Sequence, residues 1–359
     1  MYLGSDDYAT LADQIKTWGR SLGFQQVGIA DTDLSAAEVH LCRWISEGYQ
    51  GEMGYMAAHG IKRSQPAALV PGTIRIVSAR MDYLPSSAAD PKQVLANPTL
   101  GYVSRYALGR DYHRVLRKRL ETLAQRIAAG VGPFGYRVFT DSAPVLEKAL
   151  AEKAGLGWIG KHTNLIARGT GSWCFLGEIY TTLPLPTDAP SPSHCGRCRR
   201  CLNACPTGAL VAPYRLDARR CIAYLTIEFG GSIPEALRPL MGNRIYGCDD
   251  CQLACPWNRF APHTQESDFA VRHGLDAPPL VQIMDWSESA FSRHTEGSAI
   301  RRIGHERFLR NVAVALGNAS RNDEATIAVL QRHTTHPSAL VREHVQWALQ
   351  RQGRSGKGC

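Results

Sequence analysis

Two runs of cysteine hold the residues of this sequence whose spacing could do redox chemistry. They are Cys195-Gly-Arg-Cys198-Arg-Arg-Cys201-Leu-Asn-Ala-Cys205-Pro206 and Cys248-Asp-Asp-Cys251-Gln-Leu-Ala-Cys255-Pro256. The spacing C-x2-C-x2-C-x3-C-P is typical of [4Fe-4S] ligands, because three thiolates wrap one face of the cluster while the fourth points elsewhere. Pairs of C-x2-C also bind zinc, which is the alternative interpretation, although zinc could not carry electrons.

The number of thiolates indicates how many clusters the chain could hold. A cubane needs four ligands and the second run offers only three, so Cys221, which lies between the runs, completes a set of eight. In two-cluster ferredoxins the last cysteine of each run ligates the other cluster. We therefore expect one [4Fe-4S] cluster on Cys195, Cys198, Cys201 and Cys255, and a second on Cys205, Cys221, Cys248 and Cys251. The remaining Cys42, Cys174 and Cys359 are expected to be buried or tolerated thiols.

Composition and charge limit the class of protein. With 359 residues and 44% hydrophobic content, the chain is long enough for two or three domains. No signal peptide and no apolar stretch of about 18 residues is present, so we expect a soluble cytoplasmic protein with no membrane partner, and nothing demands more than a monomer. The net charge is +9, with arginines crowded around the first cysteine run and near the C-terminus. This asymmetry favours a nucleic acid partner over a merely solvated basic surface.

Helices and strands are expected to alternate before the first cysteine run. Their residue pattern predicts helices over 8–23, 35–48, 115–129 and 145–154, and strands over 24–30, 73–83, 137–140 and 172–181. This alternation predicts an α/β domain over residues 1–185. A ferredoxin-like domain with the two clusters should follow over 186–278. Apolar faces at helical spacing then predict an all-α, HEAT-like tail over 279–359, with helices at 307–318, 323–333 and 338–351.

Several motifs taken together resemble those of epoxyqueuosine reductases. They are Phe139-Thr-Asp141-Ser-Ala-Pro-Val-Leu-Glu147, Gly157-Trp-Ile-Gly-Lys161-His-Thr-Asn164, Gly171-Ser172-Trp, the ferredoxin-type cysteines and Cys221-Ile-Ala-Tyr-Leu-Thr-Ile-Glu228. The resemblance implies a cobalamin-dependent, iron-sulfur oxidoreductase that reduces epoxyqueuosine to queuosine at the wobble position of tRNA. It also implies that the α/β domain binds cobalamin, as in reductive dehalogenases. Asp111-Tyr-His113 lacks the glycine of a D-x-H-x-x-G signature, so we expect no histidine ligand to cobalt there.

The resemblance also assigns roles to individual residues. Asp141 matches the proton donor of the family, and an apolar corrin beside it should raise its pKa by disfavouring the charged form. From its position alone, Asp141 is better interpreted as the N-cap of the helix that follows, and the resemblance reverses this preference. The residues matched to cobalamin binding are Arg63, Ser104, Tyr106, Asp141, Lys161, Asn164, Ser172 and Ala223.

The same resemblance indicates the partners. The anticodon stem-loop of tRNA should be bound mainly through its phosphates, with the wobble nucleotide leaving its stack to enter the pocket. Candidate phosphate contacts are Arg197, Arg199, Arg200, Arg301, Arg302, Arg307 and Arg310. An external donor such as a flavodoxin or ferredoxin system must supply electrons. The alternative functions are a cobalamin and iron-sulfur reductase of a small molecule and a plain electron-transfer protein. The long segment before the cysteines argues against the second of these.

Overall fold

A four-stranded sheet forms the centre of the first half of the molecule. The structure, a computed structural model, describes residues 5–353, so Cys359 lies outside it. The sheet has the order β1-β2-β7-β4, and all three pairings are antiparallel. Its strands are β1 (Gln26–Ala30), β2 (Arg75–Asp82), β7 (Cys174–Thr181) and β4 (Tyr136–Phe139). Each lies within two residues of the strand expected from the sequence.

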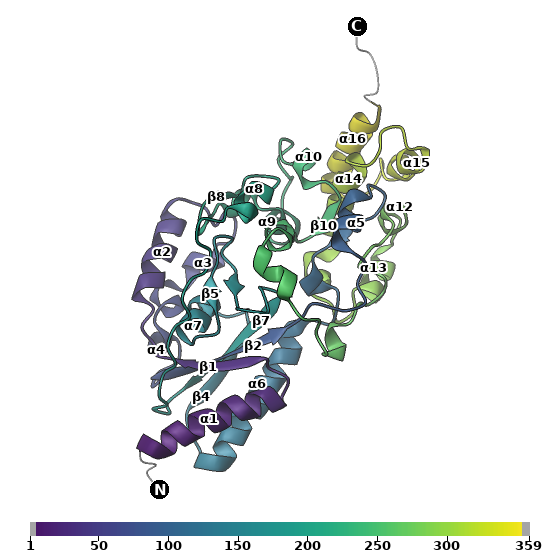
Figure 1. Ribbon diagram of the computed structural model, residues 1–359. Coiled ribbons are helices and arrows are strands. Elements are labelled where there is room, and N and C mark those ends of the chain that lie inside the picture. The colour runs from purple at the N-terminus through teal and green to yellow at the C-terminus, as the bar shows by residue number, and fades with distance from the viewer. Residues whose placement is uncertain (1–4, 354–359) are drawn as a thin grey trace.

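Helices cover both faces of this sheet (Figure 1). Helices α1 (Ser5–Ser21) and α6 (Tyr112–Val131) pack on one face, and α7 (Glu147–Lys153) packs on the other. Val77 and Ala79 of β2 belong to the core with α1 and α6, whereas Ile76 belongs to the core under α7. Because both faces are covered, the central strands are apolar along most of their length. Ser78 and Glu178 are buried polar exceptions, and they pair directly across β2 and β7.

The remaining elements of the first half are short and surround the sheet. They are α2 (Ser35–Ser46), α3 (Tyr55–Ala58), α4 (Pro66–Leu69), α5 (Pro91–Ala96), β3 (Tyr102–Val103) and the hairpin of β5 (Trp158–Ile159) and β6 (Leu165–Ile166). Strand β3 pairs in parallel with β10 (Arg244–Tyr246) from the second half of the chain. The two halves are therefore joined by strand pairing as well as by side-chain packing.

The cysteine region consists of short helices and one hairpin. It contains α8 (Arg200–Ala204), β8 (Leu210–Ala212), β9 (Arg215–Leu216), α9 (Ile222–Ile227), α10 (Arg238–Met241), β10 and α11 (Asp250–Leu253). The tail follows as α12 (Leu280–Met284), α13 (Glu288–His294), α14 (Gly304–Gly317), α15 (Glu324–Arg332) and α16 (Ala339–Gly353). The three helices expected in the tail are α14, α15 and α16. No helix among residues 5–353 has both the length and the apolar character needed to span a membrane.

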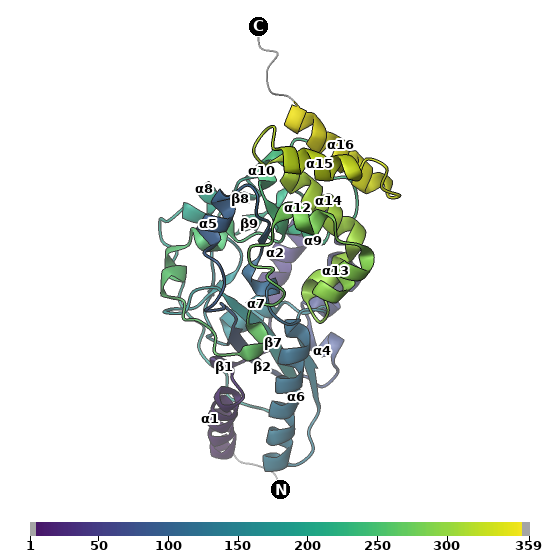
Figure 2. The ribbon, with the colours of Figure 1, turned by 90° about the vertical axis from the view of Figure 1, so that its right-hand side faces the viewer.

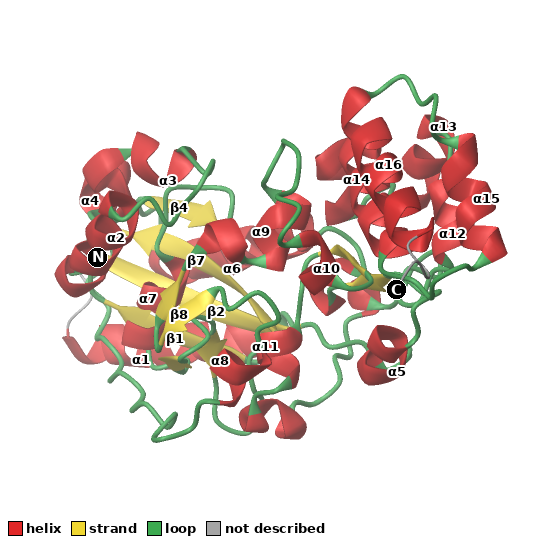
Figure 3. Cartoon of the chain, turned by 90° about the horizontal axis from the view of Figure 1, so that it is seen from above, coloured by secondary structure: helices red, strands yellow, loops and turns green. Residues whose placement is uncertain are grey.

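The tail forms a separate group of helices in the view from above, but its core is not separate (Figure 3). One hydrophobic cluster includes Val103 of β3, Leu225 of α9, Ile245 of β10, Val312 of α14 and Val345 of α16. Helices α1 and α16 lie at opposite ends of the molecule (Figures 1 and 2). The boundary expected at residue 279 therefore runs through a shared core.

Candidate active site and cluster ligands

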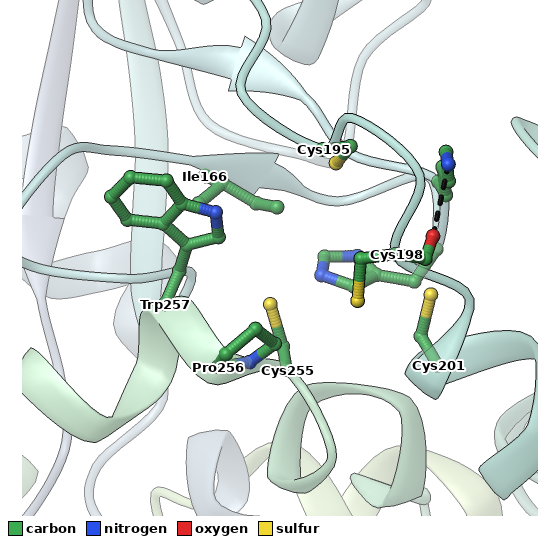
Figure 4. A pocket seen from close by; sticks show the side chains of 9 residues that line it. Ile166, Cys195, Cys198, Cys201, Cys255, Pro256 and Trp257 are labelled. Atoms are coloured by element: carbon green, nitrogen blue, oxygen red, sulfur yellow. Dashed lines mark hydrogen bonds between the residues drawn. The ribbon is translucent and has the colours of Figure 1, made fainter.

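Four cysteines from two distant segments line one small cavity. Cys195, Cys198 and Cys201 come from the loop before α8 and its first turn, and Cys255 follows α11. Figure 4 shows their side chains around a common space, and the cavity has a volume of about 30 Å³. These four residues are the set expected to hold one cluster, including the crossed ligand Cys255. Their role as ligands stays a prediction, but the fold brings the complete set together.

Lysine and tryptophan side chains support this cysteine loop. Lys161 donates from Nζ to the carbonyl oxygens of Gly196, at 2.6 Å, and Cys198, at 2.9 Å. Trp257 lines the cavity and packs edge-to-face on Trp158, with ring centroids 5.1 Å apart. Lys161 thus binds the backbone that carries the cysteines, which is a role the sequence did not assign to it.

A second group of cysteines adjoins the first. Burial raises the pKa of Cys251 well above its usual value, and the nearby Cys221, Cys205 and Cys201 raise it further. Cys205 also acts on Cys221, whose pKa is raised mainly by burial. These effects indicate that Cys205, Cys221 and Cys251 are neighbours, and the packing of α8 against α11 agrees with this. Their role as ligands of the second cluster stays a prediction.

Cys248, the fourth expected ligand, has a different partner in this structure. Its thiol lies 2.9 Å from Oδ2 of Asp250, and that carboxylate also accepts from Arg244 at 2.5 and 2.6 Å. Its assignment to the second cluster stays a prediction. Across residues 5–353, no group of three or more His, Cys, Asp or Glu side chains is placed to hold a single metal ion.

Asp141 lies on the loop between β4 and α7, where the backbone has a positive φ of 55°. Aspartate tolerates this left-handed conformation better than most residues do. Its carboxylate accepts a hydrogen bond from the hydroxyl of Tyr112 and lies 3.2 Å from Nε2 of His113. The N-cap of α7 is Leu146, so the alternative reading of Asp141 as a helix cap is wrong.

Helix α6 supplies both partners of Asp141 from its first turn. Asp111 is the N-cap of this helix and accepts from the backbone N–H of His113 at 3.2 Å. The carboxylate of Asp141 therefore lies at the positive end of the helix dipole, which favours a negative charge. Nδ1 of His113 lies 2.6 Å from Oδ1 of Asp111. Arg302, on the 3₁₀ turn Ala299–Ile303 of the tail, donates to the other oxygen of Asp111 at 3.2 Å.

The raised pKa expected for Asp141 beside a corrin stays a prediction, and the protein's own groups act on this pKa in the opposite sense. Burial acts to raise its pKa, but hydrogen bonds from His113 and Tyr112 outweigh burial and lower it. Burial acts to lower the pKa of His113, but the hydrogen bonds with Asp111 and Asp141 outweigh burial and raise it. The two shifts favour an imidazolium-carboxylate pair, in which the side chain of Asp141 is half-exposed at 52%.

Two further carboxyl groups lie beneath Asp141. Oε1 of Glu147 accepts the backbone N–H of Asp141, and burial followed by the charge of Asp141 raises the pKa of Glu147 to about 8. Glu178 is fully buried, and neither of its carboxyl oxygens has a hydrogen-bond partner among the described residues. A hydrogen bond to Glu147 would require a proton shared between the two carboxyl groups. Burial and then Glu147 raise the pKa of Glu178 well above its usual value. A buried carboxyl without a donor must be protonated, so this pair holds at least one proton near neutral pH.

Lys148 and Tyr55 are titratable neighbours of this loop. Lys148 is exposed, and desolvation lowers its pKa. Glu147, Asp141 and Cys251 all act on its charge. Burial followed by Glu228 and Asp141 raises the pKa of Tyr55 to about 12. The Asp141 loop and Cys251 therefore both lie within electrostatic range of Lys148.

The residues matched to cobalamin binding divide into two groups. Arg63, Tyr106 and Asp141 form the first group: Tyr106 packs edge-to-face on Tyr112, which donates to Asp141, and Nε of the buried Arg63 has no hydrogen-bond partner among the described residues. Ala223 is half-buried on α9, two residues after Cys221.

The other matched residues have partners within the protein. Ser104 donates to Oδ1 of Asp249 at 2.5 Å, and Ser172 binds Asn258 and Gln252. Asn164 lies half-buried in the hairpin of β5 and β6, and Lys161 holds the cysteine loop as described. For these positions, cobalamin binding stays a prediction.

One of the arginines expected to contact phosphate is misassigned. Arg310 has no exposed surface and donates to the carbonyl oxygens of Leu225, Phe229 and Gly231. Arg302 lies beside the active site, whereas Arg197, Arg199, Arg200 and Arg301 are exposed. The apolar spacing of α14 did not reveal that an arginine would be buried among its leucines and valines.

Reasoning from the sequence also missed most partners of Asp141. Tyr112, His113 and Arg302 come from two distant segments, and Glu178 comes from a central strand. The available signal was Glu178 itself, a carboxylate in an otherwise apolar strand.

Comparisons with known proteins give a consistent result. A family model described as a 4Fe-4S double cluster binding domain matches residues 194–258, which include all eight cysteines of the two groups, and one described as epoxyqueuosine reductase QueG matches residues 63–142. The epoxyqueuosine reductase of Pseudomonas aeruginosa is 60% identical over 357 residues, 98% of this chain and 98% of that protein. That of Escherichia coli K12 is 56% identical and covers 98% of this chain and 92% of that protein.

Solved structures agree with these relatives. A selenomethionine-labelled epoxyqueuosine reductase has a TM-score of 0.89 at 28% identity, and one with an epoxyqueuosine-modified tRNA-Tyr stem loop has 0.88 at 27%. Each covers 96% of this chain, and this chain covers 91% of each. The Bacillus subtilis enzyme, with its catalytic aspartate loop swung out of the active site, has 0.87 at 27%, with the same coverage. From its near-complete match to relatives of such high identity, the chain belongs to the epoxyqueuosine reductase family of oxidoreductases.

Proposed function

We propose that this protein reduces epoxyqueuosine to queuosine in tRNA, with Asp141 and His113 as the source of the proton. The observation that carries the proposal is the shared position of Lys148, on which both Asp141 and Cys251 act. This supports a common site for the Asp141 loop and the second cysteine group. The family relationship and the solved complex of a relative with a modified tRNA stem loop support the same substrate.

The residues around this site fit the cofactors that the family implies. The eight cysteines would hold two [4Fe-4S] clusters, and the unpartnered Nε of buried Arg63 is a donor of the kind that a corrin amide or a nucleotide phosphate needs. Tyr106 and Ala223 border the same region. Cobalamin would supply a strong low-potential reductant that no side chain can imitate.

The side chains of the chain manage the protons. Removal of the epoxide oxygen as water consumes two electrons and two protons, and leaves a carbon-carbon double bond. His113 carries the first proton between Asp111 and Asp141 and passes it from Nε2 to the Asp141 carboxylate, which then donates it to the leaving oxygen. A positioned acid of this type contributes about 10²–10⁴-fold to a rate. Glu147 and Glu178 lie behind the loop with a proton of their own.

Binding of the tRNA requires the wobble nucleotide to leave its stack and reach Asp141. Arg302 stands next to this entrance, and the exposed Arg301 is close to it in sequence. Phosphate contacts of this kind depend on salt concentration, because each neutralised phosphate releases counterions. We infer that the tail contributes one part of the tRNA surface at Arg301 and Arg302.

Anaerobic turnover tests this function directly. The protein with reconstituted clusters and cobalamin is supplied with titanium(III) citrate and tRNA bearing epoxyqueuosine, and nucleosides are analysed by mass. We expect queuosine to form only when cobalamin is present, and Asp141→Asn to lose turnover while it retains iron and cobalamin. No conversion by the fully loaded protein would contradict the proposal and favour a small-molecule substrate, whereas retained turnover in Asp141→Asn would remove Asp141 from the proton-donor role.

A further inference from the structure

A second and larger cavity adjoins the one lined by the first cysteine group. Its volume is about 510 Å³, and it lies between the loop that starts at Leu84, the beginning of α8 and the 3₁₀ turn Pro256–Phe260. Cys255 and Pro256 line both cavities. Only Cys255, an expected ligand of the first cluster, and Pro256 would therefore separate that cluster from a molecule bound in the larger cavity.

The rim of this cavity is basic. Lys92, Arg200 and Arg259 line it, are exposed, and make no ion pair with any residue from 5 to 353. Asp90, the carboxylate among the lining residues, is already engaged as the N-cap of α5, where it accepts two backbone N–H groups at 2.9 Å. The rim therefore presents positive charge that the fold does not neutralise.

The floor adds a further cation. Arg105 lines the cavity with only 3% of its surface exposed. It donates from Nη2 to the carbonyl oxygen of Ala89, but its Nη1 has no hydrogen-bond partner among the described residues. A buried guanidinium nitrogen without a partner is costly. Its presence under a basic rim indicates a site that is completed by a negatively charged molecule.

Apolar surface lies next to this charge. Phe260 is 51% exposed, and the guanidinium of Arg259 lies over its ring at 4.5 Å from the centroid. Leu84, Pro85 and Leu253 line the cavity itself. An exposed aromatic and aliphatic patch with arginine at its edge is typical of protein-protein interfaces, where aromatic residues and arginine are enriched.

We propose that this surface, formed by Lys92, Arg200, Arg259 and Phe260 around the cavity, is the docking site of an acidic electron-transfer protein that reduces the first cluster. The inference rests on the proposed function, because the reaction consumes two electrons that the chain does not itself generate. The reduced donor gives up one electron per encounter and is oxidised. Two such transfers, with two protons, account for cleavage of the epoxide and release of its oxygen as water.

The position of the basic cavity favours a protein over RNA. The cavity shares Cys255 and Pro256 with the cavity of the first cysteine group, whereas Asp141, His113 and Arg302 line neither of the two. An electron donor seated here would leave the substrate entrance free, as a reductase that binds tRNA and donor together requires.

Charge reversal on the loaded enzyme tests the proposal. The double variant Lys92→Glu and Arg259→Glu is compared with Arg117→Glu and Lys118→Glu, which makes the same charge change on exposed positions of α6. Arg200 is left unchanged because it is also a candidate phosphate contact for tRNA. Cluster reduction is followed by anaerobic stopped-flow absorbance, with reduced flavodoxin as the protein donor and titanium(III) citrate as the small reductant. Electrostatic steering changes association rates by about 10–10³-fold. We therefore expect the flavodoxin rate at low salt to fall by at least about 10-fold in the rim variant only.

The two reductants separate the possible results. A normal titanium(III) citrate rate and unchanged tRNA affinity, together with the slowed flavodoxin rate, support the docking site. An unchanged flavodoxin rate overturns it, and so does an equal loss with both reductants. Weaker tRNA binding with normal flavodoxin reduction would assign the surface to RNA and also overturn the proposal. Turnover driven by titanium(III) citrate tests the reductase function without the protein donor. Failure of the docking proposal therefore does not imply failure of the proposed function, and the reverse also holds. The single variant Arg259→Gln provides a milder change with the same expected direction.

Discussion

The acid chemistry of Asp141 depends on side chains that the sequence places far from it. His113 and Tyr112 hold its carboxylate in the ionised form, and Arg302 fixes Asp111 on the other side of the imidazole. Replacing His113 by Asn should slow single-turnover reduction by about 10²-fold, because the proton carrier is lost. Loss of its hydrogen bond should also raise the pKa of Asp141, which moves the pH profile of the residual activity upward.

Matched measurements separate this effect from a general loss of structure. His40 is exposed on α2, so His40→Asn makes the same chemical change away from the site and should leave the rate and its pH profile unchanged. Cobalamin absorbance and iron content should be normal in both variants. An unaltered pH profile in His113→Asn would show that the imidazole does not set the protonation of Asp141.

The raised pKa of Glu147 makes a prediction about stability. The folded protein binds a proton at this carboxyl up to about pH 8, whereas the unfolded chain releases it near the ordinary value of 4.5. The folded state therefore binds more protons in this window, and its stability falls as pH rises from about 4.5 to 8. In Glu147→Gln the urea midpoint should fall less steeply over that range, whereas exposed Glu235→Gln should follow the wild type. Parallel curves for the wild type and Glu147→Gln would contradict the assignment.

Prediction from the sequence reached the motif residue but not its surroundings. Asp141 was found because a short contiguous motif carries it, and cysteine spacing is similarly local. The partners of Asp141 come from the start of α6, the 3₁₀ turn before α14 and the central strand β7. Their meeting depends on strand order and on packing of the tail, which no local pattern encodes. The lowered pKa of Asp141 was missed for the same reason, since its cause is contact with His113 and Tyr112.

At the scale of elements, two buried polar side chains of α14 bind the tail to the backbone of the cysteine region. Arg310 and Asn311 are both fully buried; Asn311 donates to the carbonyl oxygens of Thr226 and Ile245, at 2.9 Å each. Arg310 satisfies three carbonyl oxygens of the segment after Cys221. Arg310→Met would leave these acceptors without donors, so we expect a loss of about 2–4 kcal/mol in the free energy of unfolding.

Urea denaturation measures this loss, with Arg301→Met as the control because Arg301 is exposed. The effect of the two variants on tRNA affinity should be the reverse of their effect on stability. Arg301→Met should weaken binding and reduce its salt dependence, whereas folded Arg310→Met should bind tRNA normally. A stable Arg310→Met with impaired tRNA binding would restore Arg310 to the phosphate contacts.

The existence of most elements, unlike their arrangement, followed from local pattern. The long strands β2 and β7 are covered on both faces, which produces apolar runs that are easily recognised. Their neighbours are not sequential: β7 lies between β2 and β4, so the order required contacts across the whole first half of the chain. The pairing of β3 with β10 joins segments more than a hundred residues apart, and β3 has only two residues, which is too short for a recognisable strand pattern.

At the scale of the whole molecule, the three expected domains share packing that a division by sequence does not show. Linkers rich in proline and shifts in composition mark where the chain changes character, but they do not report which core each part joins. The cluster that contains α14 and α16 also contains α9 and β10, and Cys221 and Cys248 pack against it. The helical tail is therefore part of the support of the second cysteine group.

Truncation before Pro279 follows from this shared core. A tail that only bound tRNA could be removed with loss of tRNA affinity alone, but the shared core indicates a different result. Removal of Leu309, Val312 and Val345 exposes the side chains of α9 and β10 that they cover, at about 1.5–3 kcal/mol for each buried aliphatic residue. Exposure of only a few such residues therefore costs more free energy than the net stability of a typical domain. The truncated chain should therefore be insoluble or hold about four irons in place of about eight after reconstitution. Removal of only the residues after Gly353, outside the described core, is the control and should keep all of the iron. A soluble truncated protein with a full iron content would show that the cysteine region folds without the tail.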